Sequence, residues 1–433
     1  MKSLHIPVVI ASILLAALKM PASDFDRHFT NATLRIDYIF SGDASHTDIS
    51  LSSLSSYNGW AGRRHSLDRL PLLGNGRLTA TTSIGDTIYR TSFSSLYHEW
   101  LDTDEAMATP RAMQNTLLIP MPIDTTYITI ELSDQRHDII SSMTHRIIPS
   151  DILIRQVNNN NGKSKQRRTK YIQYSGTPAE CIDVTICAEG YTEAQYDLFI
   201  SDAKRTVESI ASHQPFTDNI DRFNFIAVFV PSDDSGVSVP RLGQWKSTAY
   251  SSHFSTFYST RYLTTENIFS LHDSLDGLPY EHIIILANTE EYGGGGIYNA
   301  YTLTTAHHPR FSPVVVHEFG HSFGGLADEY FYPDDIMNGI YPHDIEPWEP
   351  NITTLTDFKS KWETSIMPGT PIPTPDNQPS YTIGVYEGGG YSAKGVYRPA
   401  IDCRMRSNDA SSFCPVCSNW LESLIDFYVP SEL

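Results

Sequence analysis

Three continuous apolar runs in the second half of the chain constrain its fold more than any other feature. They are CIDVTICAEGY from residue 181, FNFIAVFVP from residue 223 and YEHIIILANT from residue 280. Continuous apolar runs are typical of strands that are buried on both faces of a parallel sheet. Residues 192–213, between the first two runs, carry apolar residues at helical spacing. This order predicts a mostly parallel, twisted sheet covered by helices from about residue 171 onward.

Residues 24–155 follow a different pattern, in which short runs rich in Thr, Tyr and Ile alternate with turn residues. Apolar and polar positions in these runs alternate with a period of two, which predicts a β-sandwich. We therefore expect a chain of the α+β or α/β class, with an N-terminal β-sandwich at 24–155 and a second domain at 171–433. The polar and basic stretch between them, residues 156–170, predicts an exposed linker.

The first 23 residues have the layout of a secretory signal peptide. Lys2 precedes an apolar run, Ile6–Leu18, that is too short to span a bilayer. A buried N-terminal strand or helix is the alternative. The formal net charge is −19, from 31 Lys and Arg against 50 Asp and Glu, which disfavours nucleic acid and anionic membranes as partners. We expect an exported protein, periplasmic, on the cell surface or secreted, without stable membrane insertion.

The five cysteines divide into two groups along the chain. Cys181 and Cys187 lie in one strand-like run, where six extended residues span about 20 Å and exclude a disulfide between them. Cys403, Cys414 and Cys417 cluster near the C-terminus and are better candidates for a disulfide. The segment FCPVC also resembles half of a zinc knuckle, but no second CxxC lies nearby.

Residues 314–330, VVVHEFGHSFGGLADEY, carry the pattern with the clearest chemical meaning. His317 and His321 are four residues apart, so on a helix they lie on the same side, one turn apart. Two imidazole nitrogens at that spacing can bind one zinc ion. Glu318 follows the first histidine and is placed to take a proton from a zinc-bound water. The motif therefore predicts a Zn²⁺-dependent hydrolase with Glu318 as its general base.

A catalytic zinc ion needs a third protein ligand and one open position. Gly324 and Gly325 can end the helix and turn the chain back toward the metal. Asp328 follows this turn closely and is the preferred third ligand. Glu329 and a residue further along the chain, such as Glu387, are the alternatives.

Motifs in order along the chain resemble the secreted immunoglobulin-A peptidase-like family of zinc metallopeptidases of gut bacteria, a metzincin-like branch of the zincins. They are AEGYT (188–192), PFTDNIDRFN (215–224), SDDSGVSVP (232–240), GGGGIYN (293–299), HEFGHSFGGLADEY (317–330), KGVYRP (394–399) and CRMRS (403–407). The N-terminal stretch resembles that family's accessory domain, on the motifs RIDYIF (35–40), NGWAGRR (58–64) and SLYHEWLDT (95–103).

This resemblance implies a zinc endopeptidase that acts on a protein or glycoprotein, with a zinc-binding helix and an irregular C-terminal subdomain. It implies a methionine turn at Met405 that packs beneath the metal. It also implies an edge strand at Ile297, Tyr298 and Asn299 that forms a rim for the substrate. The third histidine of the ordinary metzincin pattern falls at Ala327, which cannot bind a metal, so the narrower family's acidic ligand takes its place.

Two other functions fit the same residues. One is a surface binding protein built on a degenerate zincin scaffold, although an intact Glu318 argues against it. The other is a zincin that cleaves glycopeptides or cell-wall peptides. Tyr391 and Tyr397 are candidate donors to an oxyanion. The natural substrate, the cleavage of immunoglobulin A and the oligomeric state stay open at this point.

Overall fold

The computed structural model of the 433-residue chain describes residues 24–157, 167–332, 339–377 and 382–430. The expected signal peptide and most of the expected linker lie outside these residues. The strands are β1 (Phe29–Asp43), β2 (His46–Asn58), β3 (Gly76–Thr81), β4 (Thr87–Phe93), β5 (Arg111–Pro122), β6 (Thr126–Ser133), β7 (Ile139–Ile147), β8 (Arg155–Gln156), β9 (Arg168–Gln173), β10 (Ile182–Glu189), β11 (Phe223–Phe229), β12 (His282–Ala287), β13 (Gly294–Ile297), β14 (Tyr301–Thr305), β15 (Tyr386–Gly389) and β16 (Ser392–Arg398). The α helices are α1 (Asp24–His28), α2 (Leu96–Leu101), α3 (Tyr196–Ala211), α4 (Phe216–Asn219), α5 (Ile268–Leu275), α6 (Phe311–Ser322) and α7 (Pro415–Tyr428).

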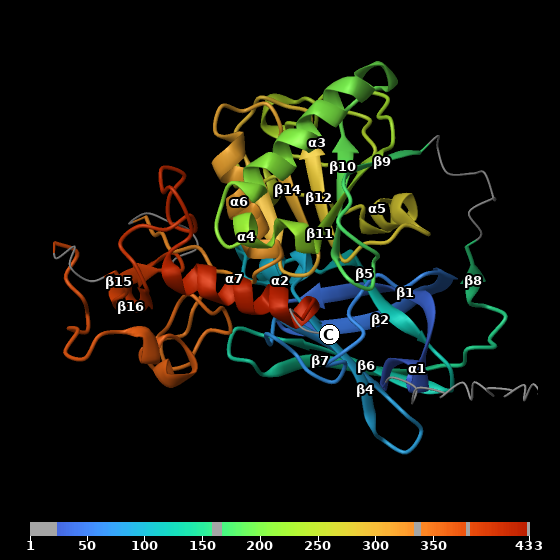
Figure 1. The fold of residues 1–433 in the computed structure, drawn as a ribbon, viewed down its shortest axis with the longest axis horizontal. Coiled ribbons are helices and arrows are strands. Elements are labelled where there is room, and N and C mark those ends of the chain that lie inside the picture. Colours follow the sequence, from blue (N-terminus) through green and yellow to red (C-terminus); the bar gives the residue numbers. More distant parts are fainter. Residues whose placement is uncertain (1–23, 158–166, 333–338, 378–381, 431–433) are drawn as a thin grey trace, which may run out of the picture.

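Two four-stranded sheets form the N-terminal part of the molecule, with the strand orders β5–β1–β2–β8 and β4–β3–β6–β7 (Figure 1). Neighbouring strands are antiparallel except β2 and β8. Leu34, Ile36 and Tyr38 of β1 share one hydrophobic core with Leu78 and Ile130 of the second sheet. The expected β-rich N-terminal part is therefore confirmed, as is the mixture of helices and strands along the chain.

A six-stranded sheet forms the second part of the molecule, in the order β13–β14–β12–β10–β11–β9. Its four inner strands are parallel, and the edge strands β13 and β9 are antiparallel to their neighbours. The three apolar runs form β10, β11 and β12, in which every residue is buried. Their continuous hydrophobicity follows from this position, because both faces of each strand are covered.

The two faces of the six-stranded sheet have different covers. Helices α3, α6 and α7 share a core with one face, which includes Val184 and Ile186 of β10. The other face, which includes Cys187 of β10 and Ile285 of β12, shares its core with α5 and with the N-terminal sheets. Helices thus cover only part of the sheet, whereas the sequence had predicted helices alone. The N-terminal strands replace them because a parallel strand of this composition must be covered on both sides.

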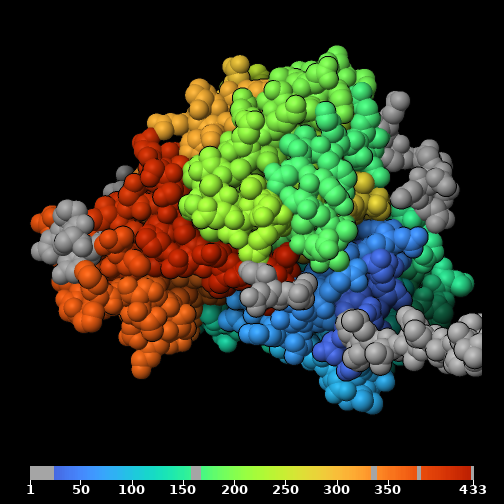
Figure 2. All heavy atoms as spheres, viewed as in Figure 1, coloured from blue at the N-terminus to red at the C-terminus, as the bar shows by residue number. Residues whose placement is uncertain are grey.

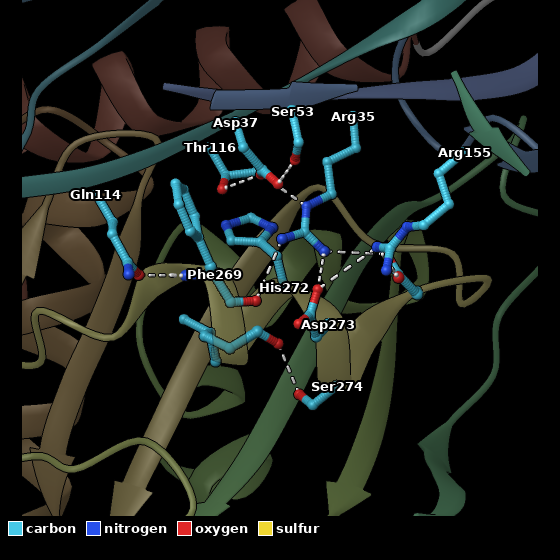
Figure 3. A network of polar contacts seen from close by, with 12 residues as sticks. Arg35, Asp37, Ser53, Gln114, Thr116, Arg155, Phe269, His272, Asp273 and Ser274 are labelled. Carbon is cyan, nitrogen blue, oxygen red and sulfur yellow. Dashed lines mark hydrogen bonds and ion pairs between the residues drawn. The ribbon is translucent and has the colours of Figure 1, made fainter. Parts of the chain in front are cut away.

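A network of charged side chains joins the two parts of the molecule (Figure 3). Arg35 of β1 is 1% exposed, and its guanidinium lies 2.8 Å from Asp37 of the same strand. Across the interface it lies 2.7 Å from Asp273 of α5 and 3.2 Å from Asp276, which directly follows that helix. Its Nη2 also donates to the carbonyl oxygen of Phe269. A buried arginine with this many partners fixes the orientation of one part relative to the other.

The C-terminal helix α7 also contacts both parts of the molecule (Figures 1 and 2). The ring Nε2 of His65, from the N-terminal part, lies 2.9 Å from the carbonyl oxygen of Phe427. Arg222, from the second part, lies 2.9 Å from Asp426. In Figure 2 the C-terminal atoms, in red, lie against both the green and the blue parts of the surface. Among the described helices, none has the length and hydropathy that crossing a bilayer requires.

The described ends of the expected linker are built into the sheets. Gln156 ends β8, and Arg168 begins β9 at the edge of the six-stranded sheet. Arg167 donates to the carbonyl oxygens of Ser274 and Asp276 at 2.9 and 3.0 Å. Arg167 therefore uses its charge for contacts inside the protein.

Candidate metal centre and active-site cleft

Helix α6 presents the two histidines of the HExxH motif on one side, with their Nε2 atoms 3.1 Å apart. The Nδ1 of His317 lies 2.9 Å from the carbonyl oxygen of Arg404, and the Nδ1 of His321 lies 2.6 Å from that of Leu326. A carbonyl oxygen only accepts, so each Nδ1 carries a proton. The Nε2 of each ring is therefore the atom that would offer a lone pair to a metal ion, and the backbone fixes the orientation of both rings.

The carboxylate of Asp328 points at the same spot. Its Oδ1 lies 3.0 Å from the Nε2 of His317 and 3.3 Å from the Nε2 of His321. Asp328 is 7% exposed, and its Oδ1 accepts no further hydrogen bond from the described residues. Burial alone would raise the pKa of Asp328, but the two histidines hold that pKa well below its ordinary value. Three donors that converge in this way repel one another unless protons or a metal ion lie between them, and two imidazoles with one carboxylate are a donor set that fits a metal ion.

The turn after α6 brings Asp328 into this position. Gly325 has a φ of 59°, in the left-handed region that favours glycine. The side-chain amide of Asn351 then holds the next segment, since it accepts from the backbone N–H of Ala327 at 2.8 Å and donates to its carbonyl oxygen at 2.9 Å. The neighbouring Glu329 points away from the histidines, toward Cys417. Glu387 lies on β15 and pairs with Lys394 at the surface.

Glu318 lies against the glycine-rich edge strand β13. A Cβ at Gly294 would lie only 2.6 Å from its Oε1, and a Cβ at Gly296 would overlap its backbone oxygen. These glycines are required because helix and strand approach too closely for a side chain. Burial raises the pKa of Glu318 above its ordinary value, although the two motif histidines lower it in part. A carboxylate with a raised pKa beside a metal centre suits a general base.

A cleft of about 740 Å³ opens in front of these residues, and both parts of the molecule line it. Arg261, Tyr330 and Tyr332 come from the second part, with the guanidinium of Arg261 over both tyrosine rings. Glu99, on α2 of the N-terminal part, accepts a hydrogen bond from the hydroxyl of Tyr262. Burial raises the pKa of Glu99 to about 7. The N-terminal part therefore supplies one wall of the cleft.

Comparison with family models assigns both parts of the chain. The model of the IgA peptidase M64 family matches residues 171–382 and 375–425, and that of the peptidase M64 N-terminus matches residues 24–144. The chain belongs to the IgA peptidase M64 family. The predicted resemblance, with its N-terminal accessory domain, is thereby confirmed, and the family makes the chain a peptidase. A comparison with curated proteins found no match.

Ile297, Tyr298 and Asn299, which the family resemblance assigned to a substrate rim, lie where the N-terminal part of this peptidase contacts the second part. Ile297 and Tyr298 line the cleft but are only 1% and 3% exposed. The carbonyl oxygen of Tyr298 accepts from the backbone N–H of Ser94, and the Asn299 amide donates to the carbonyl oxygen of Ser92. The edge strand itself is β13, Gly294–Ile297, which begins earlier than the expected rim.

Met405 is fully buried behind α6. A Cβ at Gly320 would lie 2.7 Å from its Sδ, so the thioether packs directly against the helix that carries the histidines. The backbone on either side of this sulfur also supports the centre. Arg404 accepts from His317, and Met405 accepts from the backbone N–H of Glu329 at 2.9 Å. The segment thus holds both the first histidine and the chain next to Asp328.

The sequence alone had singled out two tyrosines as donors to an oxyanion. Tyr391 lines the cleft, and its hydroxyl donates to Oδ2 of Asp328, so it orients a candidate ligand. Tyr397 lies on β16, where its backbone pairs with Thr353. Reasoning from sequence missed Glu99, Arg261 and Asn351. No spacing signal could have found them, because each reaches the site from a segment distant in the chain.

Proposed function

We propose that the chain is an exported zinc endopeptidase of metzincin-like architecture that hydrolyses peptide bonds of proteins or glycoproteins. The observation that carries this proposal is the convergence of His317, His321 and Asp328 on one point, with Glu318 beside them. Two imidazole nitrogens and one carboxylate oxygen form a donor set that suits zinc and leaves a coordination position open.

The proposed chemistry divides between the metal and the side chains. Zinc bound by these three residues would polarise the scissile carbonyl and acidify a water molecule beside it. Glu318 accepts the proton of the attacking water and then returns it to the nitrogen of the leaving amine. Its raised pKa favours both steps, because the carboxyl group must bind a proton firmly enough to carry it between them. Gly294 leaves room for this carboxylate.

The residues that line the cleft support a polypeptide substrate. Its lining includes the exposed tyrosines Tyr258 and Tyr332, and aromatic side chains are enriched where proteins bind other proteins. The cation of Arg261 lies among them and can attract a carbonyl oxygen or an acidic group. Strand β13 is antiparallel to β14 and also bridges to Tyr262 at Gly294, and we place the substrate backbone in the part of the cleft that its glycines line.

The test uses the chain from residue 24 onward, purified without chelators. We expect one zinc ion at the histidine site, cleavage of a broad peptide library and loss of cleavage with a chelator. Glu318→Gln should abolish cleavage and keep the metal. Glu387→Gln is the matched control, since that carboxylate lies away from the histidines and both properties should survive.

Two outcomes would contradict the proposal. Unchanged cleavage by Glu318→Gln would exclude the general base. No cleavage by the zinc-loaded wild-type chain would instead favour a binding protein on a zincin scaffold. To assign the substrate class, the products from proteins, glycopeptides and cell-wall peptides are identified by mass spectrometry. Export through residues 1–23 is tested separately, by cell fractionation.

A further inference from the structure

A second cluster of potential ligands lies behind the candidate metal centre. It consists of Cys403, Cys414, Cys417 and Glu329, which are 0%, 3%, 0% and 0% exposed. Their three sulfur atoms and a carboxylate oxygen all lie within 4.8 Å of one another. Cys414 directly precedes α7 and Cys417 lies in its first turn, so the CxxC pair is presented by the start of one helix. The fold therefore brings three thiol sulfur atoms and one carboxylate oxygen together at one buried point.

The spacing of these atoms fits tetrahedral coordination. With Zn–S bonds of about 2.3 Å, two sulfur ligands of one zinc ion are about 3.8 Å apart. The Sγ atoms of Cys403 and Cys417 are 3.7 Å apart. The Sγ of Cys417 lies 3.1 Å from Oε1 of Glu329, somewhat shorter than the roughly 3.5 Å expected for a sulfur and an oxygen ligand. We propose that these four residues bind a second, structural zinc ion.

The hydrogen bonds around the cluster support a bound cation. Oε1 of Glu329 accepts from the side-chain amide of Asn351 at 2.9 Å, whereas Oε2 is buried and has no partner in the described parts of the chain. A buried carboxylate oxygen without a partner is costly unless a cation or a proton balances it. The backbone N–H of Cys414 donates to the Sγ of Cys403 at 3.2 Å, as outer partners of metal-bound thiolates do.

A disulfide is the competing use of these cysteines. All five cysteines of the chain are free thiols in the structure, and the cluster contains three sulfur atoms rather than two. One disulfide would use only two of the three sulfur atoms and leave the third as a buried thiol beside the Glu329 carboxylate. A metal ion uses all three sulfur atoms and the carboxylate together, which is why we favour it.

The second ion would link the backbone segments that hold the ligands of the first ion in place. Glu329 directly follows Asp328, and its backbone N–H donates to Met405. Cys403 precedes Arg404, whose carbonyl oxygen receives the Nδ1 proton of His317. Zinc bound to both segments and to the start of α7 would hold these parts of the candidate centre in register.

The experiment measures metal and thiols in the full exported chain and needs no peptidase activity. We expect two zinc ions per chain in the wild type. His317→Ala combined with His321→Ala should lose one ion, and Cys414→Ser combined with Cys417→Ser should lose the other. Cys187→Ser is the matched control, because this buried cysteine lies on β10, outside the cluster, and the full metal content should be kept.

Two further measurements keep the proposal falsifiable even if the double cysteine variant does not fold. Denatured wild-type protein with chelator should show five titratable thiols, whereas a disulfide would leave three. Cobalt(II) loaded into the histidine double variant should give thiolate-to-metal charge-transfer absorption. Three titratable thiols, or a chain that binds a single ion and loses it in the histidine variant, would overturn the second site. Failure of the proposed peptidase activity would leave both readouts unaffected.

Discussion

Replacing Tyr391 with phenylalanine would remove one hydroxyl from behind the candidate metal centre. That hydroxyl donates to Oδ2 of Asp328, while Oδ1 of the same carboxylate faces the two histidines. The backbone N–H of Tyr391 donates to Tyr330, and the two rings pack edge to face with centroids 5.5 Å apart. Phenylalanine keeps the backbone hydrogen bond and the ring contact, so the variant removes only the hydroxyl and its polar contacts with Asp328 and Tyr330.

The expected loss follows from the charge and burial of the acceptor. A hydrogen bond to a charged group contributes about 1.5–3 kcal/mol, and removal of an outer partner of a metal ligand typically weakens metal binding about 10- to 100-fold. Those ranges agree, because each factor of ten is about 1.4 kcal/mol. Asp328 is 7% exposed, so water replaces the hydroxyl poorly. We therefore expect zinc affinity to fall by about 30- to 100-fold, or roughly 2–2.7 kcal/mol.

Competition with a chromophoric chelator measures this affinity directly. Tyr397→Phe is the matched control, since Tyr397 lies on the neighbouring β16 and pairs through its backbone with Thr353. Its zinc affinity should equal that of the wild type. If Tyr391→Phe also bound zinc as tightly as the wild type, Asp328 would not be an oriented ligand and the reasoning about the third donor would be refuted.

Three other substitutions test the surroundings of the site. Gly294→Ala should reduce cleavage at least tenfold without loss of zinc, as its methyl group displaces the proposed general base; Gly389→Ala, with only ordinary contacts, is the control. Arg35→Ala should lower the free energy of unfolding by about 3–5 kcal/mol in denaturant titrations, because it leaves buried carboxylates unpaired. The exposed Arg155 lies 3.6 Å from Asp276 and 3.8 Å from Asp273, and Arg155→Ala should change this free energy by less than about 1 kcal/mol. Glu99 has a pKa raised to about 7 in the folded protein, so its contribution to stability is complete below about pH 4.5 and is lost as pH rises through 7. Glu99→Gln should therefore gain stability relative to the wild type between pH 5 and 8, and equal pH profiles for the two proteins would contradict this burial effect.

Much of the fold was predictable because its signals are local. The runs that form β10, β11 and β12 are apolar throughout, and only a strand covered on both faces requires such a run. The elements that pack on the two faces of this sheet could not all be predicted. The sequence pattern around β1 predicts a separate domain, yet Arg35 of this strand is buried against α5, which lies more than 230 residues later in the chain. That contact depends on docking, which leaves no periodic pattern in either segment.

The candidate site divides in the same way. The grouping of His317, Glu318 and His321 on one helix could be predicted from the sequence, because one helical turn brings them together whatever the rest of the chain does. Asp328 could be favoured but not separated from Glu329, since a difference of one residue depends on the exact path of the turn. In the structure, Asn351 holds that turn, and the adjacent carboxylates point at two different clusters.

The sequence by itself determined the helix that carries the HExxH motif, the strands of the central sheet and the family, because each rests on neighbours along the chain. Only the tertiary structure decided which side chains complete the site. Glu99 from the N-terminal part, Arg261 from a loop and Tyr391 beyond β15 meet at one cleft. The same holds for Cys403 and Glu329, which are far apart in sequence and join in one buried group. Contacts of this kind arise from the packing of distant segments, and packing is a property of the folded chain.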